Sequence, residues 1–501
     1  MFLVRGMEGV KYICFRQIEY SLVLRKELVD ATMEMELISR EIITPSTPTL
    51  PHLRIYPLSF LDIVIPANYM PSLFFYQPNE VRQECDQKTK ISHLKKSLSQ
   101  VLSRYYPFAG RLIDRRSIEC NDQGVLFLVT RITGTKLSTI FQNPTETLLN
   151  PLYPDGLQWQ VMSSIESILA IQINCFACGG MAISVCMSHK IGEAATLFNF
   201  VHDWATVNRE KEGELLLPSP FLDGGVSLFP QGDLPVFPEM VFAKDNSSTL
   251  VCRRFVFPAS KIKSLKAMVS SHGVQNPTRV DIVTAWIHKC VVSALGLTLN
   301  KTSLCIAANL RGKMVPPLPD KCIGNMAWRY FVLNPVVDKS DRELPELVRK
   351  LKEGLREFSE VYPNKFGGNN KDLTFISECL KQASPIPEPL NKALPAPEPC
   401  GFDLKEKEFF FTYTSLCRLP MYETDFGWGK PIWVTATGMP MMNAVFFMDT
   451  KDGGGIEALV NMDEKNMARF ERNAELLQFA SLNPNPWPYL SIMQSSLNSR
   501  F

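Results

Sequence analysis

The sequence has little excess charge of either sign. Its 53 Lys and Arg residues nearly balance 51 Asp and Glu residues, which gives a formal net charge of +2. A strongly basic face of the kind that holds nucleic-acid phosphates is therefore not expected, and a nucleic-acid partner is excluded from the hypotheses below. Any phosphate binding has to be local, through a few Lys or Arg side chains or a helix N-terminus.

The sequence also lacks a clear membrane-spanning run. The one uncharged stretch long enough to cross a bilayer, residues 167–188, contains Gln172, Asn174 and the pair Gly179-Gly180, so we interpret it as buried sheet. Residues 1–34 mix acidic with basic residues and have no clean apolar centre, unlike signal and transit peptides. We expect them to be a disordered or artefactual extension, and we expect no membrane partner.

No disulfide framework or metal-binding pattern is present. The 13 cysteines are odd in number and scattered, which favours a reducing compartment, and the cytosol is the expected location. Cys175 and Cys178 form a single C-x-x-C pair within a strand-like segment, so no metal site is predicted. A Gly-x-Ser-x-Gly elbow is also missing. A serine hydrolase using Ser188 with its neighbour His189 is disfavoured, because adjacent side chains on a strand point to opposite faces.

One histidine stands at a junction between two predicted elements. Apolar residues at every second position from Met181 to Met187 predict a strand, and Gly179-Gly180 predicts the hairpin turn before it. His189 is the next residue on the inward face of that strand, and helical spacing downstream predicts a helix that begins near Glu193. His189 is therefore either a satisfied core histidine or a general base held between strand and helix.

Two motifs decide in favour of the base. Residues 189–193, His-Lys-Ile-Gly-Glu, resemble the His-x-x-x-Asp motif of the plant BAHD acyl-CoA-dependent acyltransferases, with Glu193 in place of the aspartate. Residues 425–431, Asp-Phe-Gly-Trp-Gly-Lys-Pro, match the second signature of that family without change, about 230 residues later. The resemblance covers about residues 36–485, and phrases at 39–41, 45–50 and 189–204 look closest to the alkaloid acetyltransferase branch.

The resemblance implies an α/β (α+β) fold like that of chloramphenicol acetyltransferase. Two similarly built domains, each with a mixed β-sheet flanked by helices, would leave an active-site channel at their interface. We expect an N-terminal domain over 35–210 with His189, a crossover loop over 211–248 that is rich in Pro and Gly, and a C-terminal domain over 249–501 with the 425–431 motif.

The resemblance also implies roles for the motif residues. His189 would take the proton of the acceptor, while Glu193 would pair with Arg311 and point away from the substrate. The extra methylene of Glu193 moves its carboxylate by about 1.5 Å relative to aspartate, and the alternative is that Glu193 only stabilises the first turn of its helix. The second motif would be structural, through Asp425, Gly427, Trp428 and Gly429.

Two further sets of residues are candidates by resemblance. Residues 414–416 match a Thr-Ser-Trp segment whose tryptophan can donate to the oxyanion; Leu416 cannot donate, so a backbone amide or the Thr414 hydroxyl would have to. Coenzyme A needs cationic or amide donors for its phosphates. The candidates, each of which can also be a solvated surface residue, are Arg253, Arg254, Ser260, Lys261 and Arg279.

The expected activity is transfer of an acyl group from a coenzyme A thioester to a hydroxyl, less readily an amine, of an alkaloid or related specialised metabolite. Acetyl-CoA is the first expected donor, as a co-substrate with no bound cofactor, and a monomer is expected. Malonyl-CoA stays open because Arg418 could meet a donor carboxylate. Glu193 and Leu416 also leave open a protein that keeps the fold but has altered or lost acyl transfer.

Overall fold

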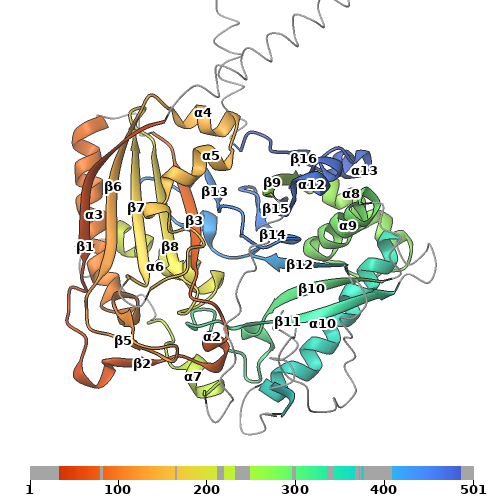
Figure 1. Ribbon diagram of the computed structural model, residues 1–501, viewed down its shortest axis with the longest axis horizontal. Coiled ribbons are helices and arrows are strands. Elements are labelled where there is room, and N and C mark those ends of the chain that lie inside the picture. Colours follow the sequence, from red (N-terminus) through yellow and green to blue (C-terminus); the bar gives the residue numbers. More distant parts are fainter. Residues whose placement is uncertain are drawn as a thin grey trace, which may run out of the picture.

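The computed structural model describes residues 33–78, 83–163, 166–210, 219–231, 249–295, 301–335, 343–366, 372, 374–376 and 409–486. Almost all of the expected extension over 1–34, and much of the crossover over 211–248, lie outside these ranges. Figure 1 shows two sheets side by side, each with helices packed against it. The expected mixed α/β architecture with two domains is confirmed.

The first sheet has six strands in the order β1-β6-β7-β8-β3-β13. Strands β7 and β8 form the predicted antiparallel hairpin, and Gly179 adopts a φ of +86° in its turn. Every residue of β7, β8 and β3 is buried, so the uncharged stretch is core sheet. The strands are β1 Glu34–Ile43, β3 Tyr69–Tyr76, β6 Val125–Thr133, β7 Leu169–Phe176, β8 Met181–Ser188 and β13 Trp433–Thr435.

Two long helices belong to this first half, α3 Gln83–Leu102 and α6 Ala194–Arg209. They pack together, and the indole N–H of Trp204 donates to the Leu94 carbonyl over 3.2 Å. Shorter elements complete the half: α2 Phe60–Ile63, α4 Leu137–Gln142, α5 Glu146–Leu149, α7 Gly224–Leu228, a small sheet of β2 Ile55–Pro57, β4 Arg111–Leu112 and β5 Ser117–Glu119, and 3-10 turns at Pro51–Leu53, Tyr106–Ala109, Asn150–Leu152 and Pro154–Gly156.

The second sheet has seven strands in the order β11-β10-β12-β14-β15-β9-β16. Helices α8, α9 and α10 lie on the side of this sheet that faces away from the first sheet (Figure 1). Its elements are β9 Leu250–Phe257, α8 Ala259–Ser271, α9 Arg279–Ala294, β10 Lys301–Asn309, β11 Ala327–Pro335, α10 Leu344–Phe366, β12 Phe409–Ser415, β14 Ala444–Asp449, β15 Ile456–Asp463, α12 Glu464–Phe470, α13 Ala474–Phe479 and β16 Ser481–Leu482, with 3-10 turns at Arg311–Lys313 and Met421–Glu423.

One strand crosses from the second half into the first sheet. Strand β13 pairs with β3, and the Trp433 ring stacks on Phe75 with 5.3 Å between centroids. The Trp433 indole donates to Glu457 over 3.3 Å, and Glu457 also accepts from Arg254, whose side chain is 6% exposed. The C-terminal half, expected as one unit over 249–501, therefore also completes the first sheet and places a buried ion pair between the domains.

Within the described ranges, no helix is both long and apolar enough to span a bilayer.

Candidate active site

His189 directly follows β8, at the point where the chain leaves the first sheet. Its backbone N–H donates to the Asn68 carbonyl over 2.8 Å, next to the last β3–β8 pair. Gly192 pairs with Gly324 of the second half as an isolated bridge. A Cβ at Gly192 would lie 2.5 Å from the Thr196 hydroxyl oxygen, so the tight approach between this loop and α6 requires glycine. The predicted helix start is confirmed, since α6 begins at Ala194 with Glu193 as its N-cap.

The His189 side chain is half-buried, and its Nδ1 atom has no hydrogen-bond partner among the described residues. Burial lowers the pKa of His189 below its ordinary value of 6.5; its own backbone, the charge of Glu193 and the Asn325 side chain oppose that shift. The imidazole is therefore neutral at neutral pH and able to accept a proton.

Asn325 and Asp62 hold the backbone of His189 in place. The Asn325 Nδ2 atom donates to the His189 carbonyl and to Asp62 Oδ1, both over 2.8 Å, and the Asn325 backbone N–H donates to the same Oδ1 over 2.7 Å. The other Asp62 oxygen accepts from the Ser59 backbone and hydroxyl, over 2.8 and 2.6 Å. Burial raises the pKa of Asp62, and the Ser59 and Asn325 hydrogen bonds oppose the rise. This network was not predicted from the sequence.

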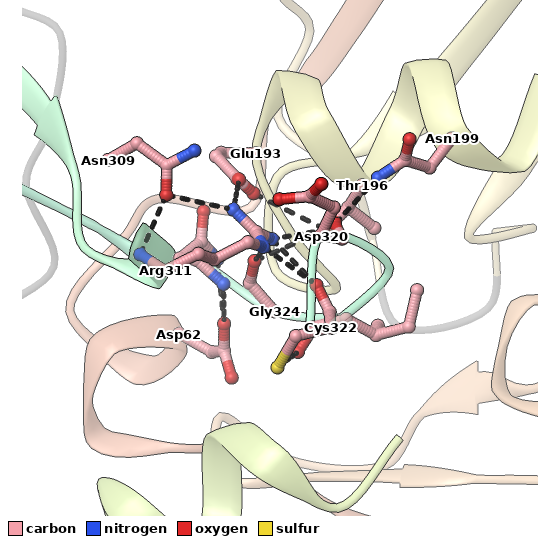
Figure 2. Close-up of polar contacts among 11 residues, drawn as sticks. Asp62, Glu193, Thr196, Asn199, Asn309, Arg311, Asp320, Cys322 and Gly324 are labelled. Carbon is pink, nitrogen blue, oxygen red and sulfur yellow. Dashed lines mark hydrogen bonds and ion pairs between the residues drawn. The ribbon is translucent and has the colours of Figure 1, made fainter. Parts of the chain in front are cut away.

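Glu193 and Arg311 form an ion pair across the two halves of the chain (Figure 2). The Arg311 side chain is 2% exposed, and its Nε and Nη2 atoms also donate to the Cys322 carbonyl, over 3.2 and 2.7 Å. Glu193 does not cap α6 through its side chain, but accepts from the Thr196 hydroxyl over 3.3 Å. The structure thus brings together the two residues that the resemblance paired, in spite of the longer acid.

Thr414 lies near the end of β12, between β10 and β14, where it pairs with Ala307 and Phe446. Leu416 follows the strand and packs against the hydrophobic core of the first domain. Its backbone N–H donates to the Phe447 carbonyl over 2.8 Å, so this amide is engaged within the second sheet. The Thr414 hydroxyl therefore stays the candidate oxyanion donor in this segment.

The 425–431 motif forms a tight turn. Asp425 accepts from the backbone N–H groups of Gly427 and Gly429 over 2.8 and 2.9 Å, and the two glycines adopt φ values of +102° and +104°. Phe426 stacks on Trp428 and also contacts the α6 residue Trp204 at 4.8 Å between centroids. These contacts support α6, the helix that follows His189.

The candidates for coenzyme A binding fall into two places. Ser260 and Lys261 lie exposed in the first turn of α8. Arg279 lies nearby, where its guanidinium donates to the carbonyls of Gly453 and Gly455 and pairs with Asp449 over 2.9 Å.

The two arginines of β9 are engaged elsewhere. Arg253 pairs with Glu471 over 3.3 Å, and Arg254 is committed to Glu457 between the domains. The structure does not gather them with the α8 residues.

A cavity of about 520 Å³ is lined by residues of both halves of the chain. It contains Asn68, whose carbonyl accepts from the His189 backbone. Burial raises the pKa of Glu146, whose carboxylate accepts from Gly438 over 3.2 Å. Within the described residues, no group of three or more His, Cys, Asp or Glu side chains is placed to hold a metal ion. The lining residues are Pro66, Ala67, Asn68, Glu146, Asn150, Gly156, Gln158, Trp159, Gln160, Val161, Leu250, Cys252, Thr437, Gly438, Met439, Pro440 and Asn461.

Comparisons with known proteins identify the family to which this chain is similar. The model of the Transferase family matches residues 33–477. The epi-neemfruitin B synthase L1AT of Melia azedarach is 36% identical over 462 residues, which cover 90% of this chain and 99% of that protein. The stemmadenine O-acetyltransferase of Catharanthus roseus is 34% identical over 445 residues, which cover 87% and 96%. The crystal structure of vinorine synthase superposes with a TM-score of 0.73 at 32% identity, covering 89% of this chain and 99% of that one.

The family match extends over nearly all of the folded chain, and the relatives align over almost their whole length. These relatives are named as acyltransferases or share the fold of one, and the family uses acyl-CoA as co-substrate. The chain therefore belongs to the BAHD family of acyl-CoA-dependent acyltransferases.

Proposed function

We propose that this enzyme transfers an acyl group, acetyl in the first instance, from coenzyme A to a hydroxyl of an alkaloid or related specialised metabolite, with His189 as general base. The observation that carries the proposal is the neutral imidazole at the end of β8, held by Asn68 and Asn325 at the junction of the two domains. Its lowered pKa keeps the unprotonated form available at neutral pH.

The reaction follows from these groups. As the acceptor oxygen attacks the thioester carbonyl, its proton passes to His189, and the Thr414 hydroxyl stabilises the developing oxyanion. The tetrahedral adduct collapses by breaking the carbon–sulfur bond, and the imidazolium returns its proton to the coenzyme A thiolate. No acyl-enzyme forms. Ser260 and Lys261, in the first turn of α8, would bind the phosphates of coenzyme A.

The donor is proposed as acetyl-CoA because the relative from Catharanthus roseus is named an O-acetyltransferase. Malonyl-CoA is the second candidate. Arg418 is exposed and adopts a φ of +70°, with its backbone N–H on Asp449 over 2.7 Å, so its cationic side chain could meet a donor carboxylate. Competition between the two thioesters for the enzyme distinguishes these donors.

A protein that keeps the fold without acyl transfer is the alternative, and Leu416 favours it. This side chain is apolar and its amide is engaged, so the oxyanion has one donor fewer than the family pattern provides. Acceptor-dependent acyl transfer by the wild-type enzyme would exclude the alternative. Activity that appears only in Leu416→Trp would support it.

The direct test is thiol release from acetyl-CoA in the presence of hydroxylated indole alkaloids, stemmadenine among them. His189→Ala should lower turnover by about 10² to 10⁴-fold, the usual contribution of a general base. His52→Ala, in an exposed 3-10 turn, is the matched control and should retain full turnover. Near-normal turnover by His189→Ala would contradict the assignment of the base.

For the protein as a whole we propose a monomer in the cytosol of a plant cell. The support for the compartment is that each cysteine the structure describes is a free thiol.

A further inference from the structure

The cavity described above contains one carboxyl group. Its lining comes from both domains, with Asn68 and Glu146 from the first and Cys252 and Asn461 from the second. Among the described residues that line it, Glu146 is the one with a formally charged side chain. A cavity of this size suits a small organic molecule, and its charge disfavours a phosphate-bearing one.

Three side chains that line the cavity each contain a buried oxygen without a hydrogen-bond partner among the described residues. The side chains of Asn461 and Thr437 are 1% and 5% exposed, and their Oδ1 and Oγ1 atoms have no partner among the described residues. The Gln158 Oε1 atom is buried and unpaired in the same way. Buried polar atoms normally have partners, so the wall of the cavity has unused hydrogen-bonding capacity at these positions.

The Asn461 Oδ1 atom lies close to the Glu146 carboxylate. A Cβ built on Gly438 would be 2.7 Å from Asn461 Oδ1 and 2.8 Å from Glu146 Oε1, so both oxygens meet at the same glycine. The Trp159 indole lines the same cavity and donates to the Thr437 carbonyl over 3.3 Å. A carboxylate beside an aromatic ring is the usual setting for a bound organic ammonium group.

The cavity lies on the side of the site away from the proposed coenzyme A residues. Leu250 and Cys252, at the start of β9, line the cavity, whereas Ser260 and Lys261 follow the far end of that strand. A strand of eight residues spans about 23 Å. Asn68 lines the cavity and its carbonyl accepts from the His189 backbone, so the wall of the cavity is hydrogen-bonded to the residue that is the proposed base.

We propose that this cavity binds the protonated amine of the acceptor, with Glu146 as its counter-ion. The inference rests on the proposed acyl transfer for the identity of the ligand as acceptor, and it narrows that acceptor to a hydroxylated amine. A neutral terpenoid alcohol of similar size would supply no counter-charge for the carboxylate.

The test compares a protonated amine with its N-oxide, which has no net charge and one additional oxygen on the nitrogen. Stemmadenine is a tertiary amine that is protonated near neutral pH, and its N-oxide keeps the skeleton and the hydroxyl but carries no net charge. Calorimetric titration of the full chain measures the affinity for each ligand in wild type, in Glu146→Gln, and in Glu36→Gln as control. Glu36 is an exposed residue of β1 outside the cavity.

Wild type should prefer the amine by about tenfold, the size expected for one partly desolvated ion pair. Glu146→Gln should lose this preference by weakening amine binding while N-oxide affinity stays constant, which also shows that the variant is folded. The control should keep the preference. An unchanged preference in Glu146→Gln, or no binding of stemmadenine to wild type, would overturn the proposal.

Thiol release separates this proposal from the proposed function. Glu146-dependent binding of stemmadenine without thiol release from acetyl-CoA or malonyl-CoA would leave the cation site standing and reject acyl transfer to it. Thiol release that is equal for neutral and cationic acceptors, and unaffected by Glu146→Gln, would leave acyl transfer standing and reject the cation site.

Discussion

Glu193 and Arg311 form an ion pair that joins the start of α6 to the 3-10 turn after β10. The two side chains are 16% and 2% exposed, so the pair is shielded from water on the arginine side. Figure 2 shows Arg311 between Glu193 and the carbonyl of Cys322, where it connects the His189 loop to the second domain. The glutamate that departs from the family pattern is therefore accommodated, because its carboxylate still reaches the arginine.

Removing the acid should leave a buried guanidinium without its counter-charge. We expect Glu193→Ala to lower the free energy of unfolding by about 3 kcal/mol, at the lower end for a broken buried pair because Glu193 is partly exposed. Glu193→Asp keeps the charge and should cost less. Denaturant unfolding measures both, with Glu36→Ala as control, because its pair with Arg131 is exposed and should contribute at most about 0.5 kcal/mol. Equal losses in Glu193→Ala and the control would contradict the expected role.

Local sequence patterns predicted much of the fold. Alternation and the glycine pair predicted the β7–β8 hairpin, and the helical spacing after Glu193 predicted α6, because both depend on contacts between residues close in sequence. Residues 464–479 have apolar residues at helical spacing, which predicts one helix, but they form two, α12 and α13. Asn473 caps the second one through its side chain, a break that apolar spacing alone does not show.

Contacts between distant segments were not predictable from one sequence. Asp62 and Asn325 are 263 positions apart, and the sequence around either residue does not indicate that they form a hydrogen bond. Arg254 was a candidate for phosphate binding because it is basic. In the fold, however, β9 lies beside β15, and the Arg254 side chain is buried against Glu457 and the Trp433 ring of β13. The cavity around Glu146 likewise needs the first and second domains to be in place.

Asp62 should act on catalysis by positioning His189 through Asn325. In Asp62→Asn, one carboxylate oxygen becomes an N–H donor that must face another donor, either Ser59 or Asn325. We expect kcat to fall by about 10²-fold, the effect of a misplacement near 1 Å, with little change in the KM for acetyl-CoA. Ser59→Ala removes one hydroxyl and should lower stability by about 1 kcal/mol with kcat almost unchanged. A rise in KM with constant kcat in Asp62→Asn would point to substrate binding instead.

The pH dependence of kcat/KM should report the His189 pKa. Burial lowers that pKa, so the basic form persists as pH falls, and the acid limb of the profile should have its midpoint below 6.5. The negative charge of Glu193 raises the same pKa. Glu193→Gln should therefore move the midpoint to still lower pH, measured at saturating acyl-CoA below the temperature of unfolding. A midpoint at or above 6.5 in wild type would show that the titrating base is not the buried imidazole.

Substitutions of the basic residues that were candidates for binding coenzyme A should have two different effects, one on the KM for acetyl-CoA and the other on stability. Lys261→Ala removes an exposed ammonium group from the first turn of α8, so the KM for acetyl-CoA should rise several-fold while stability changes by at most about 0.5 kcal/mol. Lys263→Ala, exposed on the same helix, is the matched control and should leave KM unchanged. Arg254→Met instead leaves Glu457 buried without a cation, which should cost about 3 to 5 kcal/mol of stability. Its KM for acetyl-CoA should stay near the wild-type value at temperatures where the variant is folded, because the guanidinium lies between the domains. A large rise in the KM for acetyl-CoA in Arg254→Met without loss of stability would instead indicate that Arg254 binds a phosphate of coenzyme A.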